Sequence, residues 1–192
     1  MRTLTVLFLI VLLLVAGTLG FAYSGFYNVA ATAKDPVWLN WLLITTRIHS
    51  ITSRANHVVP PPTANPAQIL AGMQSYKEMC TICHAEPGES PSPLAQGLNP
   101  MPPDLSLSSK QMSAQEMFWI IKHGIKMTGM PAWGPTHTDD QLWEIVAFLQ
   151  KLPNLTPAQY HEMAQQAAKL PNMHGHHHDH SHTATGASAH TH

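Results

Sequence analysis

The sequence is poor in charge: only 11% of its 192 residues are Asp, Glu, Lys or Arg, and the formal net charge is -1. A protein whose main task is to bind nucleic acid carries a basic patch or stripe, because contacts to phosphate supply most of the affinity. This sequence has too few basic residues for such a surface. We therefore expect no nucleic-acid partner.

The sequence also has few stretches in which apolar and polar residues alternate, the pattern of a half-buried strand, and it contains 16 prolines. Amphipathic helical patterns joined by proline-rich segments occur instead. We predict an all-α fold with a single main domain and several appendages. The expected units are a transmembrane anchor or signal at 1–23, an interfacial helix and linker at 24–64, the main domain at 65–155, an extra helix at 156–171 and a tail at 172–192.

Cysteine is rare as well, since the chain has only Cys80 and Cys83, and His84 follows directly. The motif CxxCH is typical of the covalent attachment of a c-type haem, in which both thiols form thioethers and the histidine is the proximal iron ligand. Thiol redox motifs and zinc sites share the CxxC spacing. However, no HxxxH pair follows in 85–124, and this motif ends a helical pattern instead of opening a helix after a strand. We predict one covalent haem c and keep thiol and zinc chemistry as alternatives.

The segment 3–23 contains no charged residue. A helix of this length, at about 1.5 Å per residue, crosses the roughly 30 Å hydrocarbon layer of a membrane. The apolar run exceeds the roughly 7 to 15 residues of a signal core, and the nearest cleavage-like site, Ala31-Thr32-Ala33, lies far beyond it. We expect an uncleaved anchor, with a signal peptide as the alternative. Because haem attachment at CxxCH takes place outside the cytoplasm, we expect an inner-membrane protein with its main domain on the periplasmic side.

A second helix is expected at 37–51, after Asp35-Pro36. Tryptophan is enriched at the headgroup level of membranes, and Arg47 and Arg54 can meet anionic lipid, so we predict an interfacial helix in contact with membrane lipid. Packing against the main domain or a partner subunit is the alternative. The expected apolar face consists of Trp38, Trp41, Leu42, Thr45 and Ile48.

Three helices are predicted in the main domain, after the stiff spacer Pro60-Pro61-Pro62. The first starts at Asn65-Pro66, the second at the capping box of Ser113 and Glu116, and the third at Thr138. The second is expected to end at Gly124 and the third at Pro153. Their inward residues are Ile69, Gly72, Met73, Tyr76 and Cys80; Met117, Phe118, Ile120 and Ile121; and Leu142, Ile145, Val146, Leu149 and Leu152.

Two further expectations concern these helices and the segment that joins them. Gly72 lies on an apolar face, where a glycine costs about 1 kcal/mol relative to alanine, and this suggests that another helix crosses closely there. The segment 86–109 is rich in proline and glycine, so we predict a long loop without regular structure that covers the haem with its apolar side chains.

Met130 lies between Gly129 and Pro131, in a loop that can present one side chain end-on to a metal. A thioether is a soft, neutral ligand that raises the reduction potential of haem iron, so we predict that Met130 is the distal axial ligand. Met127 and Met101 are weaker candidates. His123 is expected at the surface or near a propionate.

The C-terminal part begins with an expected helix from Thr156-Pro157 to about Leu170, outside what the haem requires. The tail that follows has no apolar periodicity and contains eight of the 14 histidines. Imidazoles at this density can bind copper, nickel or zinc. A solvated tail without such a role is the alternative. The candidate ligands are His174, His176, His177, His178, His180 and His182.

Three separated features, CTICH at 80–84, the preceding Gly72 and Tyr76, and Gly-Met-Pro at 129–131, occur in the order typical of class I cytochromes c. The chain resembles small bacterial membrane-anchored monohaem members of that family over roughly 65–153. The resemblance implies thioethers at Cys80 and Cys83, axial ligation by His84 and Met130, and a crossing of the first and last helices at Gly72 and Tyr76.

The function that the resemblance implies is electron transfer with redox partner proteins, without catalysis by this chain. A second hypothesis is a cytochrome subunit of a larger respiratory dehydrogenase or oxidase complex. A third is a haem sensor or peroxidase, which needs an open distal position.

Overall fold

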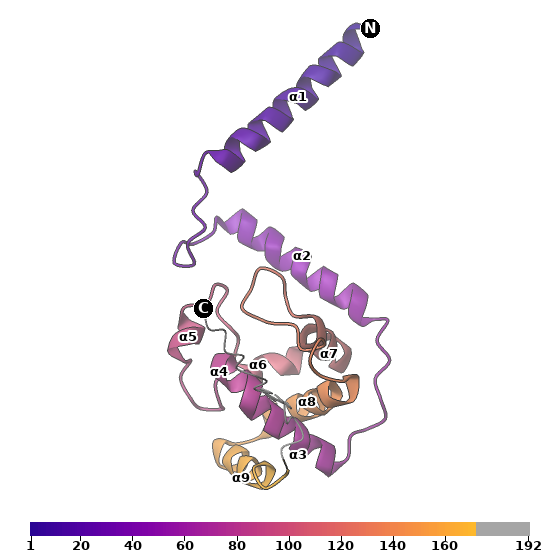
Figure 1. Ribbon diagram of the computed structural model, residues 1–192, viewed down its shortest axis with the longest axis vertical. Coiled ribbons are helices and arrows are strands. Elements are labelled where there is room, and N and C mark those ends of the chain that lie inside the picture. Colours follow the sequence, from indigo (N-terminus) through magenta and orange to yellow (C-terminus); the bar gives the residue numbers. More distant parts are fainter. Residues whose placement is uncertain (172–192) are drawn as a thin grey trace, which may run out of the picture.

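The computed structural model describes residues 1–171, and every regular element in that range is helical (Figure 1). The predicted all-α fold is confirmed. The histidines expected to bind metal in the tail lie outside the described residues. In chain order the elements are α1 (Arg2–Tyr23), α2 (Val37–Ala55), α3 (Pro66–Ser75), a π-turn (Tyr76–Cys80), α4 (Thr81–His84), α5 (Pro93–Gln96), α6 (Leu105–Ser108), a 3-10 turn (Ser109–Gln111), α7 (Ala114–His123), α8 (Asp139–Lys151), a 3-10 turn (Leu152–Asn154) and α9 (Pro157–Ala167).

Helix α1 projects away from the rest of the molecule, and none of its residues is buried (Figure 1). It is the one helix of the described part of the chain that is long and apolar enough to cross a membrane. A signal sequence near the N-terminus passes the same test. The predicted helix is therefore present, and its role as an anchor is a proposal.

Helix α2 is one turn longer than predicted, because its last turns pack on the main domain. Ile51 and Ala55 are buried there, and α2 contacts α7. The hydroxyl of Thr52 donates a hydrogen bond of 2.6 Å to Oε1 of Glu116. The alternative of packing on the main domain thus applies to the C-terminal turns of α2, while its tryptophans near the N-terminal end are exposed.

We expect Thr52→Val to lower the free energy of unfolding by about 1 kcal/mol at neutral pH, a small value because Glu116 is partly exposed. The hydrogen bond from Thr52 is the main cause that lowers the pKa of Glu116. A depressed carboxyl pKa adds stability above the unfolded value of about 4.3 and loses it as the pH falls through the folded pKa. The difference between wild type and variant should therefore shrink in acid.

Denaturant titrations at neutral pH and near pH 3 would measure this difference, with Thr46→Val, at an exposed position on the same helix, as the control. A difference that stays constant with pH would contradict the assigned role of the Glu116 carboxylate.

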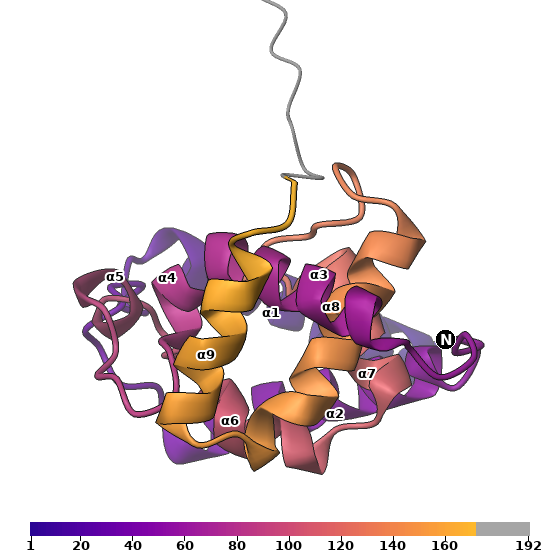
Figure 2. The same cartoon turned by 90° about the horizontal axis from the view of Figure 1, so that it is seen from below.

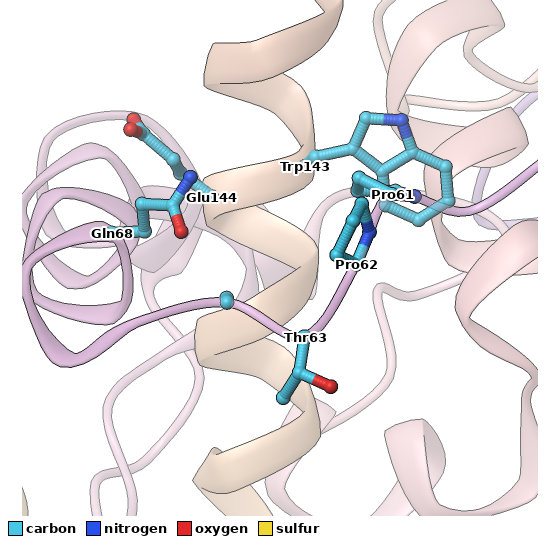
Figure 3. A pocket seen from close by; sticks show the side chains of 7 residues that line it. Pro61, Pro62, Thr63, Gln68, Trp143 and Glu144 are labelled. Carbon is cyan, nitrogen blue, oxygen red and sulfur yellow. The ribbon is translucent and has the colours of Figure 1, made fainter.

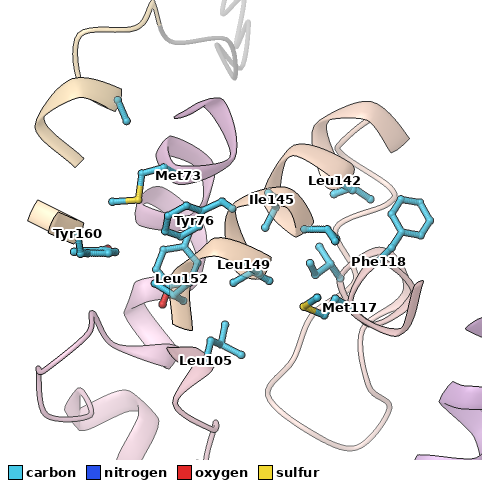
Figure 4. Packing of buried hydrophobic residues seen from close by; sticks show 14 of the residues in the cluster. Met73, Tyr76, Leu105, Met117, Phe118, Leu142, Ile145, Leu149, Leu152 and Tyr160 are labelled. Atoms are coloured by element: carbon cyan, nitrogen blue, oxygen red, sulfur yellow. The ribbon is translucent and has the colours of Figure 1, made fainter. Parts of the chain in front are cut away.

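The core of the main domain forms where α3, α7, α8 and α9 meet (Figure 2, Figure 4). Capping boxes start all four helices, as at Asn65 with Gln68, because side chains that satisfy the free N–H groups define the first turn. Gly72 lies against α8, where a Cβ would overlap the backbone carbonyl of Glu144. Tyr76 packs on Phe148 with ring centroids 5.1 Å apart. The predicted crossing of the first and last helices at Gly72 and Tyr76 is confirmed.

Helix α9 ends at Ala167, three residues earlier than predicted, and it contributes Tyr160, Ala164 and Ala167 to the core. Tyr160 is fully buried and meets the ring of Tyr76 edge-on at 6.4 Å. Figure 4 shows Tyr160 beside Tyr76 and Leu152. The apolar face of α9 therefore covers α3 on the side that α8 leaves open.

The segment 86–109 is not wholly irregular, contrary to the prediction. It contains α5 and α6, and the first residue of the 3-10 turn that follows is also within it. Ser92 and Asp104 cap the two short helices, and Pro93 occupies the first position of α5. Proline is compatible with that position because the first N–H of a helix has no intrahelical partner. The prolines here begin helical turns as well as interrupt them.

The proline spacer runs beside α8 and leaves a shallow cavity of about 220 Å³. Pro61 and Pro62 lie beside the indole of Trp143, while the carboxylate of Glu144 points away from them (Figure 3). The spacer thus connects α2 to α3 along the surface of the main domain. The cavity is lined by Pro61, Pro62, Thr63, Ala64, Gln68, Trp143 and Glu144.

Candidate functional site

The CxxCH motif follows α3 through a π-turn and ends with α4. It therefore closes a helix, as expected from the sequence. The π-turn is a local widening of the helix that is frequent at functional sites. The phenol of Tyr76 donates a hydrogen bond of 2.9 Å to the carbonyl of Ala85, the residue after the motif. The core of the domain thus holds both ends of the motif.

Cys80 and Cys83 are free thiols, both half-buried. Burial raises the pKa of Cys80 to about 12, with a smaller contribution from Cys83. A thiol redox motif needs the opposite shift, because its nucleophile is the thiolate. Within residues 1–171 there is also no cluster of three or more His, Cys, Asp or Glu side chains that could hold a metal ion. The raised pKa makes Cys80 a poor nucleophile for a thiol redox motif.

The imidazole of His84 is oriented by the loop that follows α5. Its Nδ1 lies 2.8 Å from the carbonyl oxygen of Pro103. Since a carbonyl can only accept, Nδ1 carries the proton and Nε2 keeps its lone pair for a metal. Burial lowers the pKa of His84, and the hydrogen bond to Pro103 and the charge of Asp104 offset this in part. The neutral imidazole is the form that binds iron.

Met130 belongs to a loop that backbone hydrogen bonds hold against the end of α7. The loop begins at Gly124, whose φ of +65° favours glycine and whose Cβ would clash with the backbone of Met130 and its neighbours. The carbonyl of Met130 accepts from the N–H of Ile125 at 3.1 Å, and its N–H donates to the hydroxyl of Thr128 at 3.1 Å. The N–H of Trp133 donates to the carbonyl of Ile121 at 3.0 Å. The backbone on both sides of Met130 is therefore held in place.

The other predicted candidates for the distal position lie differently. Met127 is 92% exposed, whereas Met130 is half-buried against the core. Met101 is exposed. His123 is exposed as well, with its ring 5.0 Å from that of Trp119. This arrangement supports Met130 over Met127 and Met101, and it agrees with the expected surface position of His123.

The residues present fit a covalently held haem. The two free thiols can form thioethers, while the His84 imidazole, with its lone pair on the outer nitrogen, and the Met130 thioether are neutral ligands for iron. Bound haem supplies a reversible one-electron change at its iron. Sequence analysis missed the roles of Pro103 and Thr128. The only signal for Pro103 was its place in a loop predicted to cover the haem, 19 residues from His84.

Comparison with known proteins identifies the domain that carries this motif. Residues 67–149 match the family model described as cytochrome c oxidase, cbb3-type, subunit III. No curated protein matches the chain. The matched stretch begins in α3, contains the CxxCH motif and the Met130 loop, and ends in α8. The chain therefore carries a class I c-type cytochrome domain, and the chemistry of such a domain is haem-based electron transfer.

Proposed function

We propose that the protein is a membrane-tethered electron carrier with one covalent haem c on the periplasmic side of the inner membrane. Cys80 and Cys83 would hold the haem through thioethers, and His84 and Met130 would bind its iron. The observation that carries the proposal is the hydrogen bond from His84 to Pro103, because it prepares a neutral imidazole as a ligand. The fastened loop around Met130 supports the second ligand.

Two protein ligands leave no coordination position for a substrate, so the site suits electron transfer and not bond making. The ligands themselves are neutral, and the apolar core of the domain limits the access of water. A low dielectric and a thioether ligand both favour the ferrous state. The hydrogen bonds of His84 with Pro103 and of Met130 with Thr128 hold the two ligand residues, which would keep the rearrangement that accompanies electron transfer small.

Steering by surface charge contributes little to the docking of a redox partner in this proposal. Lys77 lies 3.6 Å from Glu86, and Lys122 lies 2.7 Å from Asp139. Each of these lysines is thus partly neutralised by a carboxylate. Lys126 and Lys151 are exposed, but two separate charges do not form a patch.

A second candidate function is a cytochrome subunit of a larger respiratory complex, in which another chain performs catalysis. The match to a family described as an oxidase subunit favours it. Mild detergent extraction discriminates the two. A monomeric holoprotein supports the independent carrier, whereas a stoichiometric complex that contains a catalytic subunit supports the second candidate.

Visible spectra of the extracted protein, oxidised and reduced, test the proposed site. A denatured-haem assay reports whether the haem is covalent. The weak charge-transfer band between methionine sulfur and ferric iron reports the second ligand. Covalent haem with this band supports the closed His84/Met130 site. Covalent haem without the band, together with carbon monoxide binding to the reduced protein, would favour a sensor or peroxidase.

We expect Cys83→Ala to leave the haem attached through a single thioether or to prevent stable attachment. The yield of holoprotein should fall, and the denatured-haem spectrum should shift to that of a haem with one unreacted vinyl group. Ser90→Ala, at an exposed position in the next loop, is the control and should behave as wild type. A normal yield with an unshifted spectrum for Cys83→Ala would show that Cys83 is not bonded to the haem.

A further inference from the structure

The exposed apolar surface of α2 is not accounted for by the electron-transfer site. Trp38 and Trp41 are each 66% exposed and Leu42 is 47% exposed. Ile48 continues this surface one and a half turns further on and is also exposed. Soluble domains rarely leave two tryptophans and neighbouring leucine and isoleucine side chains uncovered in one patch. The main domain covers only the C-terminal turns of α2, where Ile51 and Ala55 are buried. The exposed N-terminal part of the helix therefore needs a different partner.

The chemistry of α2 suits a lipid surface. The helix contains no acidic residue between Val37 and Ala55, while Arg47 and Arg54 supply positive charge. Tryptophan favours the headgroup level of a bilayer, and arginine attracts anionic lipid. A protein partner with an apolar groove would not need this charge pattern. We therefore consider membrane lipid first.

The chain itself keeps α2 close to any membrane that α1 crosses. The linker at 24–36 joins the two helices, and even fully extended it spans no more than about 45 Å at about 3.5 Å per residue. It is also folded back on the main domain, because Nδ2 of Asn99 donates a hydrogen bond of 3.0 Å to the carbonyl of Ala31. The end of α1, the linker and α2 are thus held on one side of the domain (Figure 1).

We propose that α2 lies in the headgroup layer of the membrane that α1 spans and that its last turns hold the cytochrome domain in one orientation on that surface. This inference rests on the proposed membrane anchoring and adds a second contact with lipid. The buried Ile51 and Ala55 and the hydrogen bond from Thr52 to Glu116 join α2 to α7. Helix α7 and the Met130 loop that follows it therefore face the membrane.

Helix α9 lies on the opposite side of the domain, away from α2 (Figure 1, Figure 2). A redox partner that approaches the Met130 loop must then do so at the membrane surface. The partner class that fits is an electron-transfer protein held in the same membrane, since a freely diffusing protein would more easily reach the side of α9.

Spin labels in the full-length holoprotein, reconstituted in vesicles with anionic lipid, test the proposal. Both native cysteines are consumed by the haem, so a label on Leu42→Cys reports the apolar face of α2 alone. A label on Leu9→Cys reports α1, and a label on exposed Gln165→Cys reports α9. The measurement is the accessibility of each label to oxygen, which dissolves in lipid, and to a water-soluble nickel chelate.

The proposal expects the labels at positions 42 and 9 to favour oxygen and the label at position 165 to favour nickel. A label at position 42 that favours nickel, with position 9 in lipid, would overturn the inference and leave the anchor intact. A nickel-accessible position 9 would overturn the anchor itself. A label at position 42 that neither reagent reaches would overturn lipid contact in favour of a protein partner. Broadening of the label's spectrum by a label on another molecule would show that this partner is a second copy of the chain.

A second variant provides an independent readout. In the Leu42→Cys background, Trp38→Ser with Trp41→Ser should shift the label severalfold toward nickel, because the tryptophans hold the helix in the headgroup layer. Leu107→Ser, at an exposed leucine on α6, is the matched control and should leave the label unchanged. An unchanged label in the double variant would overturn the role of the tryptophans.

Discussion

Met130→Ala is expected to lower the reduction potential and to create carbon monoxide binding in the ferrous protein. Loss of the thioether removes a ligand that favours ferrous iron and opens a coordination position. The fall in potential should be a sizeable part of the roughly 0.8 V range over which axial ligands set haem potentials. Redox titration and visible spectra with carbon monoxide measure the two effects.

Met127→Ala is the matched control, because Met127 lies three residues away in the same loop and its side chain is 92% exposed. It should leave both the potential and the carbon monoxide response unchanged. If Met127→Ala produced the shift and Met130→Ala did not, the distal ligand would be Met127. If neither variant changed the potential, no methionine of this loop would bind the iron.

Gly72→Ala is expected to lower the free energy of unfolding by about 3 kcal/mol, the upper end of what overpacking a core costs. A Cβ at position 72 would overlap the backbone carbonyl of Glu144, which has no rotamer by which to move aside. The two helices must separate, and the packing of Tyr76 on Phe148 next to the haem motif loosens with them. The gain of about 1 kcal/mol in helix propensity offsets only part of this cost.

Denaturant titration of the holoprotein, followed through its visible spectrum, measures the effect of Gly72→Ala. Gly97→Ala is the control, because a Cβ there would make only ordinary contacts with neighbouring carbonyls. Gly97→Ala should change the free energy of unfolding by only a fraction of the change expected for Gly72→Ala. Wild-type stability of Gly72→Ala would mean that α3 and α8 do not cross as closely as the structure has them.

Local patterns in the sequence were sufficient to predict the helices and the haem motif. Asn65, Ser113, Thr138 and Thr156 each cap a helix at the expected residue. A cap depends on a side chain and an N–H group only three residues apart, so no distant part of the chain affects it. The short spacing of CxxCH likewise indicates its chemistry without reference to the fold.

Other features depend on contacts between distant residues, and these could not be predicted. The C-terminal end of α2 is set by its contact with α7, which lies more than 50 residues later in the sequence. The hydrogen bond from Thr52 to Glu116 is one such contact. The place of α9 in the core depends on the rings of Tyr160 and Tyr76. The apolar periodicity of one segment does not indicate which other segment will pack against it.

Sequence patterns alone were enough to predict the helical class, the starts of the main helices and a motif typical of haem attachment. These depend on propensity, capping and spacing, which act over a few residues. The tertiary structure alone decided which carbonyl orients His84, which methionine of the loop is half-buried and which half of α2 remains exposed. These follow from long-range packing, because burial and hydrogen-bond partners are properties of the folded chain.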